Sequence, residues 1–288
     1  MPESLAHWVG GKKRLMPLLS ERFAPHLTDG VGFNDLFVGS GAVTFGLLDR
    51  GLLTDCPLIR YADTLPEVRA LFSLTLADPT SLLADFIHLV RQFPPHTDYL
   101  AFRDYYNNAR QQRLLDGYLL AAGLIYISRF GFNGLWRVNR KGDCNVPPGS
   151  ACQSGEAAEA VVELISKRCQ EWLDDKSIRP ATRGYADYND ALDEIVCSTN
   201  RQVVYADPPY YKTFNAYSKA GSFDTPRLID RLEHLNVDQF TVFLSNSPDV
   251  LPLLTPDKWE VEMVSRSGSV SCDGAGRQRV SEILAKRV

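Results

Sequence analysis

The chain has 288 residues, of which 44% are hydrophobic, and its 31 basic and 35 acidic side chains give a formal net charge of −4. This length allows one large core with a smaller appended unit, and the negative charge excludes a general attraction to polyanions, so any nucleic-acid contact must come from local clusters of basic residues. The six cysteines lack Cys-x-x-Cys spacing, and the chain shows neither a signal peptide nor an apolar run near the ~18 residues of a membrane span, so we expect a cytoplasmic protein with reduced thiols, no metal and no membrane contact.

The first elements in chain order form two strand–helix units. An apolar run over residues 32–38 enters Gly39-Ser40-Gly41 and continues with helical spacing over residues 42–48. A second strand is predicted over residues 58–62; it ends on Asp63 and is followed by a predicted helix. Two such units in succession predict an α/β sheet.

A mainly helical insert then interrupts the sheet. Residues 75–126 have a helical pattern, and residues 131–142 predict a turn and a hairpin. A third strand, over residues 201–206, runs directly into Asp207-Pro208-Pro209-Tyr210. Two further elements are predicted downstream, a helix that begins at Asp224-Thr225-Pro226 and a strand over residues 240–244.

The tetrapeptide Asp207-Pro208-Pro209-Tyr210 lies at the carboxyl end of a predicted strand, where open α/β sheets bind ligands. The exocyclic amino group of a base such as adenine is a poor nucleophile because its lone pair is delocalised into the ring. Asp207 and a backbone carbonyl can accept hydrogen bonds from its N–H groups and so free that lone pair. Two prolines fix the backbone and remove two donors, and Tyr210 offers a face on which an extruded base can stack. The alternative is a proline-terminated strand with an ordinary capping Asp.

The glycine turn and Asp63 together indicate a cofactor that carries adenosine. Gly39 and Gly41 let the backbone approach a ligand at a helix N-terminus, and Asp63 follows about twenty residues later, at the position that binds ribose hydroxyls in doubly wound folds. A third glycine at dinucleotide spacing and a lysine are both missing, so a nicotinamide cofactor or a nucleoside triphosphate fits less well. The alternative is an ordinary strand-to-helix turn.

The segment 129–141 is a local basic and aromatic patch without an acidic residue. It contains Arg129, Phe130, Phe132, Asn133, Trp136, Arg137, Arg140 and Lys141. Arginine can bind guanine with two hydrogen bonds in the major groove, and an aromatic or Asn side chain can fill the gap left by a flipped base. The alternative is a solvated hairpin with buried aromatic residues.

On these motifs the chain resembles a known family, the Dam-type DNA adenine methyltransferases, which modify adenine within GATC sites. The resemblance covers nearly the whole chain in the family's order. Its motifs are Trp8-Val9-Gly10-Gly11-Lys12, Phe37-Val38-Gly39-Ser40-Gly41, Tyr61-Ala62-Asp63, Arg129-Phe130-Gly131-Phe132-Asn133-Gly134-Leu135, Asn145-Val146-Pro147, Tyr185-Ala186-Asp187, Asp207-Pro208-Pro209-Tyr210 and Leu244-Ser245-Asn246.

The resemblance implies S-adenosylmethionine as cofactor, double-stranded DNA as substrate and action as a monomer; nothing in the sequence identifies a cognate endonuclease. With the glycine turn, the expected cofactor-binding residues are Trp8, Lys12, Phe37, Gly39, Gly41, Asp63, Asp187 and Asp207. The expected catalytic residues are Asp207, Pro208, Pro209 and Tyr210. The expected DNA-binding residues are His7, Arg129, Phe132, Asn133, Leu135, Arg137, Asn139 and Pro147.

Within the DNA-binding set, the resemblance assigns Arg137 and Leu135 to base recognition, and Phe132 and Asn133 to insertion beside the target pair. Phe132 stands where the family frequently has tyrosine, which keeps a wedge and loses a hydroxyl. His7 stands where the family commonly has a lysine that reads the outer guanine. Histidine can still donate to guanine, so we expect GATC and leave open a relaxed or altered outer position; the alternative is that His7 is simply an exposed polar residue.

We therefore expect a Rossmann-like α/β methyltransferase sheet with an inserted helical and hairpin target-recognition domain. The catalytic domain is predicted over residues 1–67 and 153–288, and the target-recognition domain over residues 68–152. Two other interpretations stay open. One keeps an enzyme and changes its substrate to a cytosine amino group, an RNA adenine or a protein glutamine; the other is a non-catalytic DNA-binding protein that retains the cofactor fold.

Overall fold

The computed structural model describes residues 4–8, 10–174, 180–212, 223–267 and 279–288. Its centre is a sheet with the strand order β3-β2-β1-β4-β5-β7-β6. The strands are β1 (Gly32–Asp35), β2 (Leu58–Ala62), β3 (Ala181–Tyr185), β4 (Gln202–Ala206), β5 (Phe240–Asn246), β6 (Trp259–Ser267) and β7 (Arg279–Arg287). Strands β1 to β5 pair in parallel, whereas β7 is antiparallel to both of its neighbours. The expected α/β sheet is confirmed.

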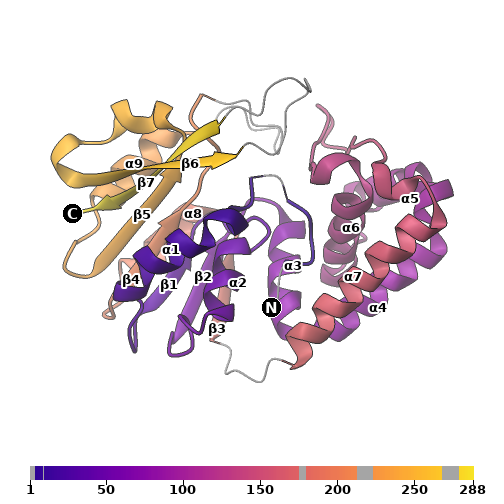
Figure 1. Ribbon diagram of the computed structural model, residues 1–288, viewed down its shortest axis with the longest axis horizontal. Coiled ribbons are helices and arrows are strands. Elements are labelled where there is room, and N and C mark those ends of the chain that lie inside the picture. The colour runs from indigo at the N-terminus through magenta and orange to yellow at the C-terminus, as the bar shows by residue number, and fades with distance from the viewer. Residues whose placement is uncertain (1–3, 9, 175–179, 213–222, 268–278) are drawn as a thin grey trace.

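Helices cover both faces of the sheet (Figure 1). They are α1 (Met16–Phe23), α2 (Ala42–Asp49), α3 (Pro66–Ala77), α4 (Pro79–Gln92), α5 (Pro95–Gln111), α6 (Gly117–Phe130), α7 (Gly155–Asp174), α8 (Tyr188–Ile195) and α9 (Thr225–Glu233). Short 3₁₀ turns are η1 (Lys12–Leu15), η2 (Ala24–His26), η3 (Phe132–Gly134), η4 (Ser150–Cys152), η5 (Pro248–Leu253) and η6 (Pro256–Lys258). Aspartates begin several helices; the Asp224 side chain accepts a hydrogen bond from the Arg227 N–H at 3.1 Å and caps α9, as predicted.

Alternation along the central strands builds two hydrophobic cores. Val203 and Tyr205 of β4 belong to the core shared with α1 and α2, whereas Val204 and Ala206 belong to the core shared with α8 and α9. All five residues of β4 are buried, as expected for a parallel strand that is covered on both faces. The strand ends are thereby held rigidly in place.

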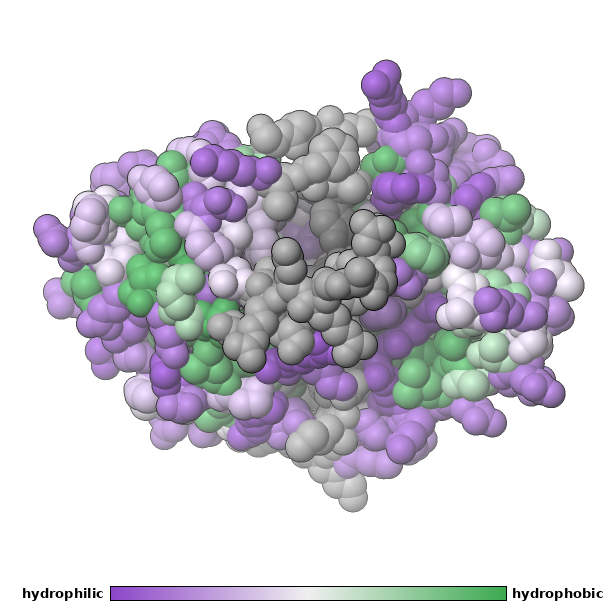
Figure 2. All heavy atoms as spheres, turned by 45° about the horizontal axis from the view of Figure 1, so that its top comes forward, coloured by the Kyte–Doolittle hydropathy of each residue, from purple (hydrophilic) through white to green (hydrophobic). Residues whose placement is uncertain are grey.

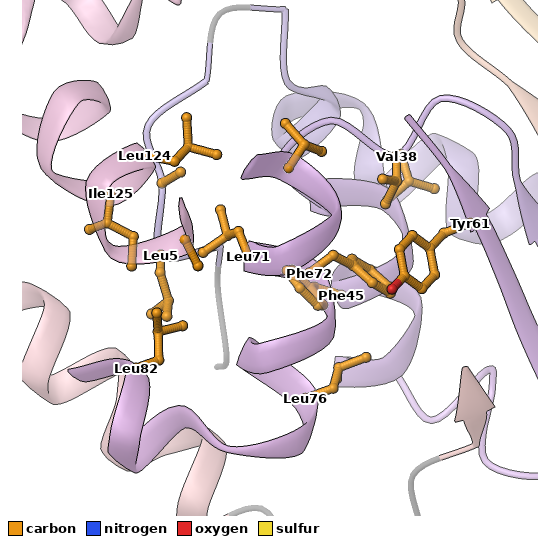
Figure 3. Close-up of a cluster of buried hydrophobic side chains, with 14 of the residues drawn as sticks. Leu5, Val38, Phe45, Tyr61, Leu71, Phe72, Leu76, Leu82, Leu124 and Ile125 are labelled. Carbon is orange, nitrogen blue, oxygen red and sulfur yellow. The ribbon is translucent and has the colours of Figure 1, made fainter. Parts of the chain in front are cut away.

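Helix α3 joins the sheet to a group of helices, α4 to α7, that lies beside it in Figure 1. The Phe72 ring stacks on Phe45 with centroids 5.0 Å apart and meets Tyr61 of β2 at 4.3 Å. Figure 3 shows these three rings on one side of α3, and Leu71 directed to the side of Ile125. One continuous core therefore connects the sheet with the helical group.

Two predicted elements differ in detail from the structure. Strand β1 ends at Asp35, earlier than expected, because the chain turns there and the Val38 N–H donates to the carbonyl of Ala62 at 3.0 Å. The expected hairpin over residues 131–142 is reduced to a turn with two isolated antiparallel bridges, one between Val138 and Cys144 and one between Gly131 and Pro148.

The division into catalytic and target-recognition domains stays a prediction; α7, which follows the predicted boundary, packs against α4 and α5. Among the described residues, no helix is both long and apolar enough to cross a membrane. On the face shown in Figure 2, hydrophobic side chains lie in separate groups between hydrophilic ones.

Candidate active site

Four predicted site segments meet at the carboxyl edge of the parallel strands. The glycine turn follows β1, Asp63 follows β2, Asp187 follows β3 and Asp207 follows β4. Strands β1 and β4 are neighbours, and β2 and β5 lie on their opposite sides, so the order of the strands reverses between them. Ligands bind at such a switch point in open α/β sheets.

The turn after β1 requires glycine at two positions. Gly39 and Gly41 have φ values of 48° and 76°, in the left-handed region that other residues rarely adopt. A Cβ atom on Gly41 would lie 2.5 Å from the Phe45 ring, and one on Gly39 would lie 3.3 Å from Nε1 of Trp8. Trp8, which comes from the N-terminal segment, therefore lies against the turn.

Two acidic residues flank this turn. The Asp63 carboxylate accepts hydrogen bonds from the N–H groups of Gly39 at 3.2 Å and Leu65 at 2.9 Å, and burial raises its pKa to about 6. Asp35, which none of the predicted motifs includes, accepts a hydrogen bond from the Thr44 hydroxyl at 2.8 Å, and burial raises its pKa to about 7. The Asp35 carboxylate also accepts a hydrogen bond from the backbone N–H of Phe37.

An aromatic group lies next to the turn. The Phe37 ring is 5.4 Å from Tyr188 and 5.3 Å from Phe223, measured between centroids. Asp187 caps α8 through a hydrogen bond from the Asn189 N–H at 2.8 Å, and its side chain is exposed. Apolar rings beside carboxylates suit a ligand with a flat heterocycle, hydroxyl groups and positive charge.

Lys12 connects the N-terminal segment to the end of β4. Its side chain is buried, and its Nζ lies 2.9 Å from Oδ1 of Asp207 and forms an ion pair with Glu282. Burial disfavours the ammonium, but the carboxylates of Asp207 and Glu282 outweigh that effect and raise the pKa of Lys12. Lys12 is therefore a fixed cation at the carboxyl edge of the parallel strands.

Tyr210 belongs to the same cluster. Its hydroxyl accepts a hydrogen bond from Lys12 Nζ at 3.0 Å and donates one to Glu282. Burial is the main reason that the pKa of Tyr210 is raised to about 12. The next residue, Tyr211, donates its N–H to Oδ1 of the buried Asn246 at 3.0 Å. These bonds fix the orientation of the Asp207-Pro208-Pro209-Tyr210 segment.

Glu282 is a site residue that the motifs did not identify. It lies in β7 and is buried, and its carboxylate meets a lysine 270 positions earlier in the chain. A usable signal is present, because a single acid precedes the apolar run Ile283-Leu284-Ala285, and a buried charge needs a partner. The identity of that partner is not readable from the sequence.

The predicted base-reading residues occupy one loop of the helical group. Phe132 and Pro147 are exposed, and the Phe132 N–H donates to the Pro147 carbonyl at 2.9 Å. Asn133 is also exposed and has φ 53°, and Leu135 is half-buried. The structure thus brings together the side chains that the sequence analysis assigns to insertion and to base contact.

His7 lies against this loop. Gly134 has φ 65°, and a Cβ atom there would come within 2.7 Å of the His7 ring, so only glycine fits. Partial desolvation, then the charges of Arg129 and Arg168, lower the pKa of His7. A neutral imidazole therefore lies beside the predicted base-reading residues.

Three polar members of the DNA-binding set differ in what they contact. The Arg137 guanidinium is exposed and is oriented by Asn145, with Nε donating to Oδ1 at 2.8 Å and Nη2 to the carbonyl at 3.1 Å. Arg129 instead donates to the carbonyls of Leu5 and Ser4 at 2.7 and 3.2 Å, and so holds the N-terminal segment. The Asn139 side chain accepts from the N–H groups at positions 141 and 143 and closes the turn.

The chain is similar to known adenine-specific DNA methyltransferases over most of its length. Residues 8–256 match the model of a family described as D12 class N6 adenine-specific DNA methyltransferase. The chain is 28% identical to the DNA adenine methylase of Vibrio cholerae serotype O1, with 96% of this chain and 93% of that protein covered. It is 26% identical to the DNA adenine methylase of Escherichia coli (strain K12) and to the type II methyltransferase M1.LlaDCHI of Lactococcus lactis subsp. cremoris, each with 96% of this chain and 92% of the relative covered. A solved structure, the rRNA methyltransferase aviRa from Streptomyces viridochromogenes, is 17% identical with a TM-score of 0.44, and 98% of this chain and 89% of that one are covered.

Proposed function

From the premise that the chain belongs to the D12 class of N6 adenine-specific DNA methyltransferases, we propose that it methylates adenine within GATC in duplex DNA, as a monomer, after extruding the base. Membership itself establishes an adenine-specific DNA methyltransferase that uses S-adenosylmethionine. The expected enzyme class and cofactor are thereby confirmed. The alternatives of a cytosine, RNA or protein substrate, and of a non-catalytic DNA-binding protein, are excluded. The recognition sequence, the flipping and the residue roles are the proposal.

The residues at the switch point fit the cofactor. When bound, S-adenosylmethionine supplies an electrophilic methyl group on a positively charged sulfonium. Asp63 would hold its ribose hydroxyls, Phe37 would contact its adenine ring, and Trp8 would cover the glycine turn against which the ligand lies. Three carboxylates near a cationic ligand are electrostatically favourable.

The catalytic residues lie in the cluster of Lys12, Asp207, Tyr210 and Glu282. The Lys12 ammonium holds the Asp207 carboxylate in place, and we assign this carboxylate and the Pro208 carbonyl to accepting hydrogen bonds from the adenine N6 amino group. Accepting both N–H groups directs the nitrogen lone pair toward the methyl group. The Tyr210 ring, anchored through its hydroxyl to Lys12 and Glu282, would stack on the extruded base. The rate gain then comes from positioning and from preorganised charge.

Base reading falls to the loop that contains Phe132 and Arg137. Phe132 and Asn133 would fill the space left by the flipped adenine, and Arg137 would bind a guanine edge with two hydrogen bonds. His7, kept neutral by its lowered pKa, has one ring N–H to donate to the outer guanine.

The observation that carries the proposal is the path of the N-terminal segment. Within a few residues, His7 contacts Gly134 of the base-reading loop, Trp8 contacts Gly39 of the cofactor turn, and Lys12 contacts Asp207. One short segment therefore touches all three parts that a sequence-specific adenine methyltransferase needs.

The proposal is tested by transfer of labelled methyl from S-adenosylmethionine to duplexes with GATC, with each single-base variant of it, and with 2-aminopurine at the target. We expect label on GATC, a rise in 2-aminopurine fluorescence on binding, and no transfer by Asp207→Ala. Labelling of the duplexes with a changed outer base would refute the proposal that His7 reads the outer guanine. Transfer by Asp207→Ala at the wild-type rate would refute the mechanism.

A further inference from the structure

One face of helix α5 is bonded to alternate carbonyls of the loop that contains Asn145. Three side chains, spaced three and four residues apart, make these bonds. Arg103 Nη1 donates to the carbonyl of Val146 at 3.1 Å, Asn107 Nδ2 to that of Cys144 at 2.9 Å, and Arg110 Nη1 to that of Gly142 at 3.1 Å. Asn107 also accepts the N–H of Cys144 at 2.7 Å. We call residues Arg103, Asn107 and Arg110 the α5 rail.

The rail works because the spacing of its side chains is close to the spacing of the carbonyls. Its steps of four and three residues rise about 6 Å and about 4.5 Å along the helix, two residues of extended chain span about 6.6 Å, and the long side chains of Arg103 and Arg110 at its two ends reach over the difference. A helix face can therefore bond every second carbonyl of an extended segment that runs beside it. A slip of the loop by one residue would present the wrong groups to all three side chains, so the rail fixes the register of the loop.

The register decides which side chains face away from α5. Cys144 and Val146 are buried, whereas Asn145 is half-buried and Pro147 is exposed. Asn145 in turn holds the exposed Arg137 guanidinium through two hydrogen bonds. The position of the rail is thereby transmitted to Arg137.

Arg110 also ties the loop to the catalytic sheet. Its guanidinium forms an ion pair with the fully buried Glu67 and lies 5.4 Å from the Trp136 ring. Glu67 is in the first turn of α3, which begins just after Asp63 at the end of β2. Trp136, which immediately precedes Arg137, is buried. The Arg110 side chain thus contacts Glu67 of α3 and two points of the base-reading loop, the Trp136 ring and the Gly142 carbonyl.

We propose that Asn107 and Arg110 of the α5 rail are positioning residues for sequence recognition, which set where Arg137 meets the base. This inference rests on the proposed function, since it requires that Arg137 read a base. A residue that only stabilises the fold would lower activity on all duplexes equally. Substitution of a positioning residue lowers the ratio of kcat/KM between the preferred duplex and its single-base variants.

The test compares kcat/KM for labelled methyl transfer on the preferred duplex and on its single-base variants. The variants are Arg110→Lys, which keeps the charge facing Glu67 and loses the planar fork, and Asn107→Ala. Their matched controls are Arg91→Lys on the exposed side of α4 and Asn108→Ala, the exposed neighbour of Asn107. Arg137→Ala reports on base reading itself, and the dissociation constant for S-adenosylmethionine reports on the integrity of the sheet.

We expect both rail variants to lose about tenfold in discrimination, which is the scale of one misplaced two-hydrogen-bond contact to a base, with unchanged cofactor affinity. Both controls should match the wild type. An equal loss of kcat/KM on every duplex would overturn the inference. The inference would also be overturned if Arg137→Ala changed the ratio of kcat/KM between the preferred duplex and its variants while the rail variants left that ratio unchanged. This second result would leave the proposed function intact. No methylation of any duplex by the wild type would refute the proposed function, and the inference with it.

Discussion

Replacing Lys12 by Met tests the buried charge cluster most directly. The side chains of Lys12 and Glu282 are 2% and 1% exposed, and that of Asp207 is 19% exposed. Lys12→Met keeps an unbranched side chain of similar length and leaves two carboxylates facing each other without their cation. Removing one partner of a buried ion pair costs about 3–5 kcal/mol, and because water reaches Asp207 we expect about 3 kcal/mol.

The assay is urea unfolding of the full chain, followed by circular dichroism. A second variant, Lys12→Met with Glu282→Gln, removes one of the stranded carboxylates, and we expect it to recover about 1–2 kcal/mol of the loss. The matched control is Lys167→Met on the exposed surface of α7, where a change within about 0.5 kcal/mol is expected.

A destabilisation by Lys12→Met no larger than that by the Lys167→Met control would show that the buried ion pair does not stabilise the fold. A double variant less stable than Lys12→Met would show that the two carboxylates do not repel each other in the absence of the lysine.

Three further predictions concern single side chains. Glu282→Gln should lower kcat about tenfold or more while changing cofactor affinity little, because the Tyr210 hydroxyl loses its charged acceptor; single-turnover transfer at the wild-type rate would contradict this. Gly134→Ala should cost about 1–2 kcal/mol through its left-handed φ of 65° and displace His7, so DNA binding measured by fluorescence anisotropy should weaken. Burial raises the pKa of Asp35 from 3.8 to about 7, so the unfolded chain loses this proton first, and the wild type should lose stability as pH rises from about 4 to about 7. Asp35→Asn should lose less over that interval in urea titrations; parallel curves for the two proteins would count against the buried acid.

The parallel half of the sheet and its edge motifs could be predicted because their signals are local. Prolines at 208 and 209, glycines at 39 and 41, and a run of buried residues in β4 each restrict the backbone of their own segment. The same is true of Asp224, which caps α9 as expected. Strands β6 and β7 are absent from the expected elements, although the alternation of Glu260 and Glu262 with apolar neighbours is a strand signal.

The contacts of individual side chains were predictable only in part. Arg137 and Phe132 are exposed in one loop, as a base-reading role requires. Arg129 carries the same charge as Arg137, yet its guanidinium is used to hold the carbonyls of Ser4 and Leu5. Composition gives the charge of a side chain and does not give its partner.

The residue types at the strand ends can be read from the chain alone, because Asp63, Asp207 and the glycine turn each follow a strand that its own segment predicts. How these pieces are joined depends on the fold, which brings Lys12 to Glu282 across 270 positions and Arg110 of α5 to the Gly142 carbonyl in the loop of Arg137. A buried charge or a loop carbonyl takes whichever partner the packing of distant elements brings within hydrogen-bond distance, and the residues next to it in the chain do not specify that partner.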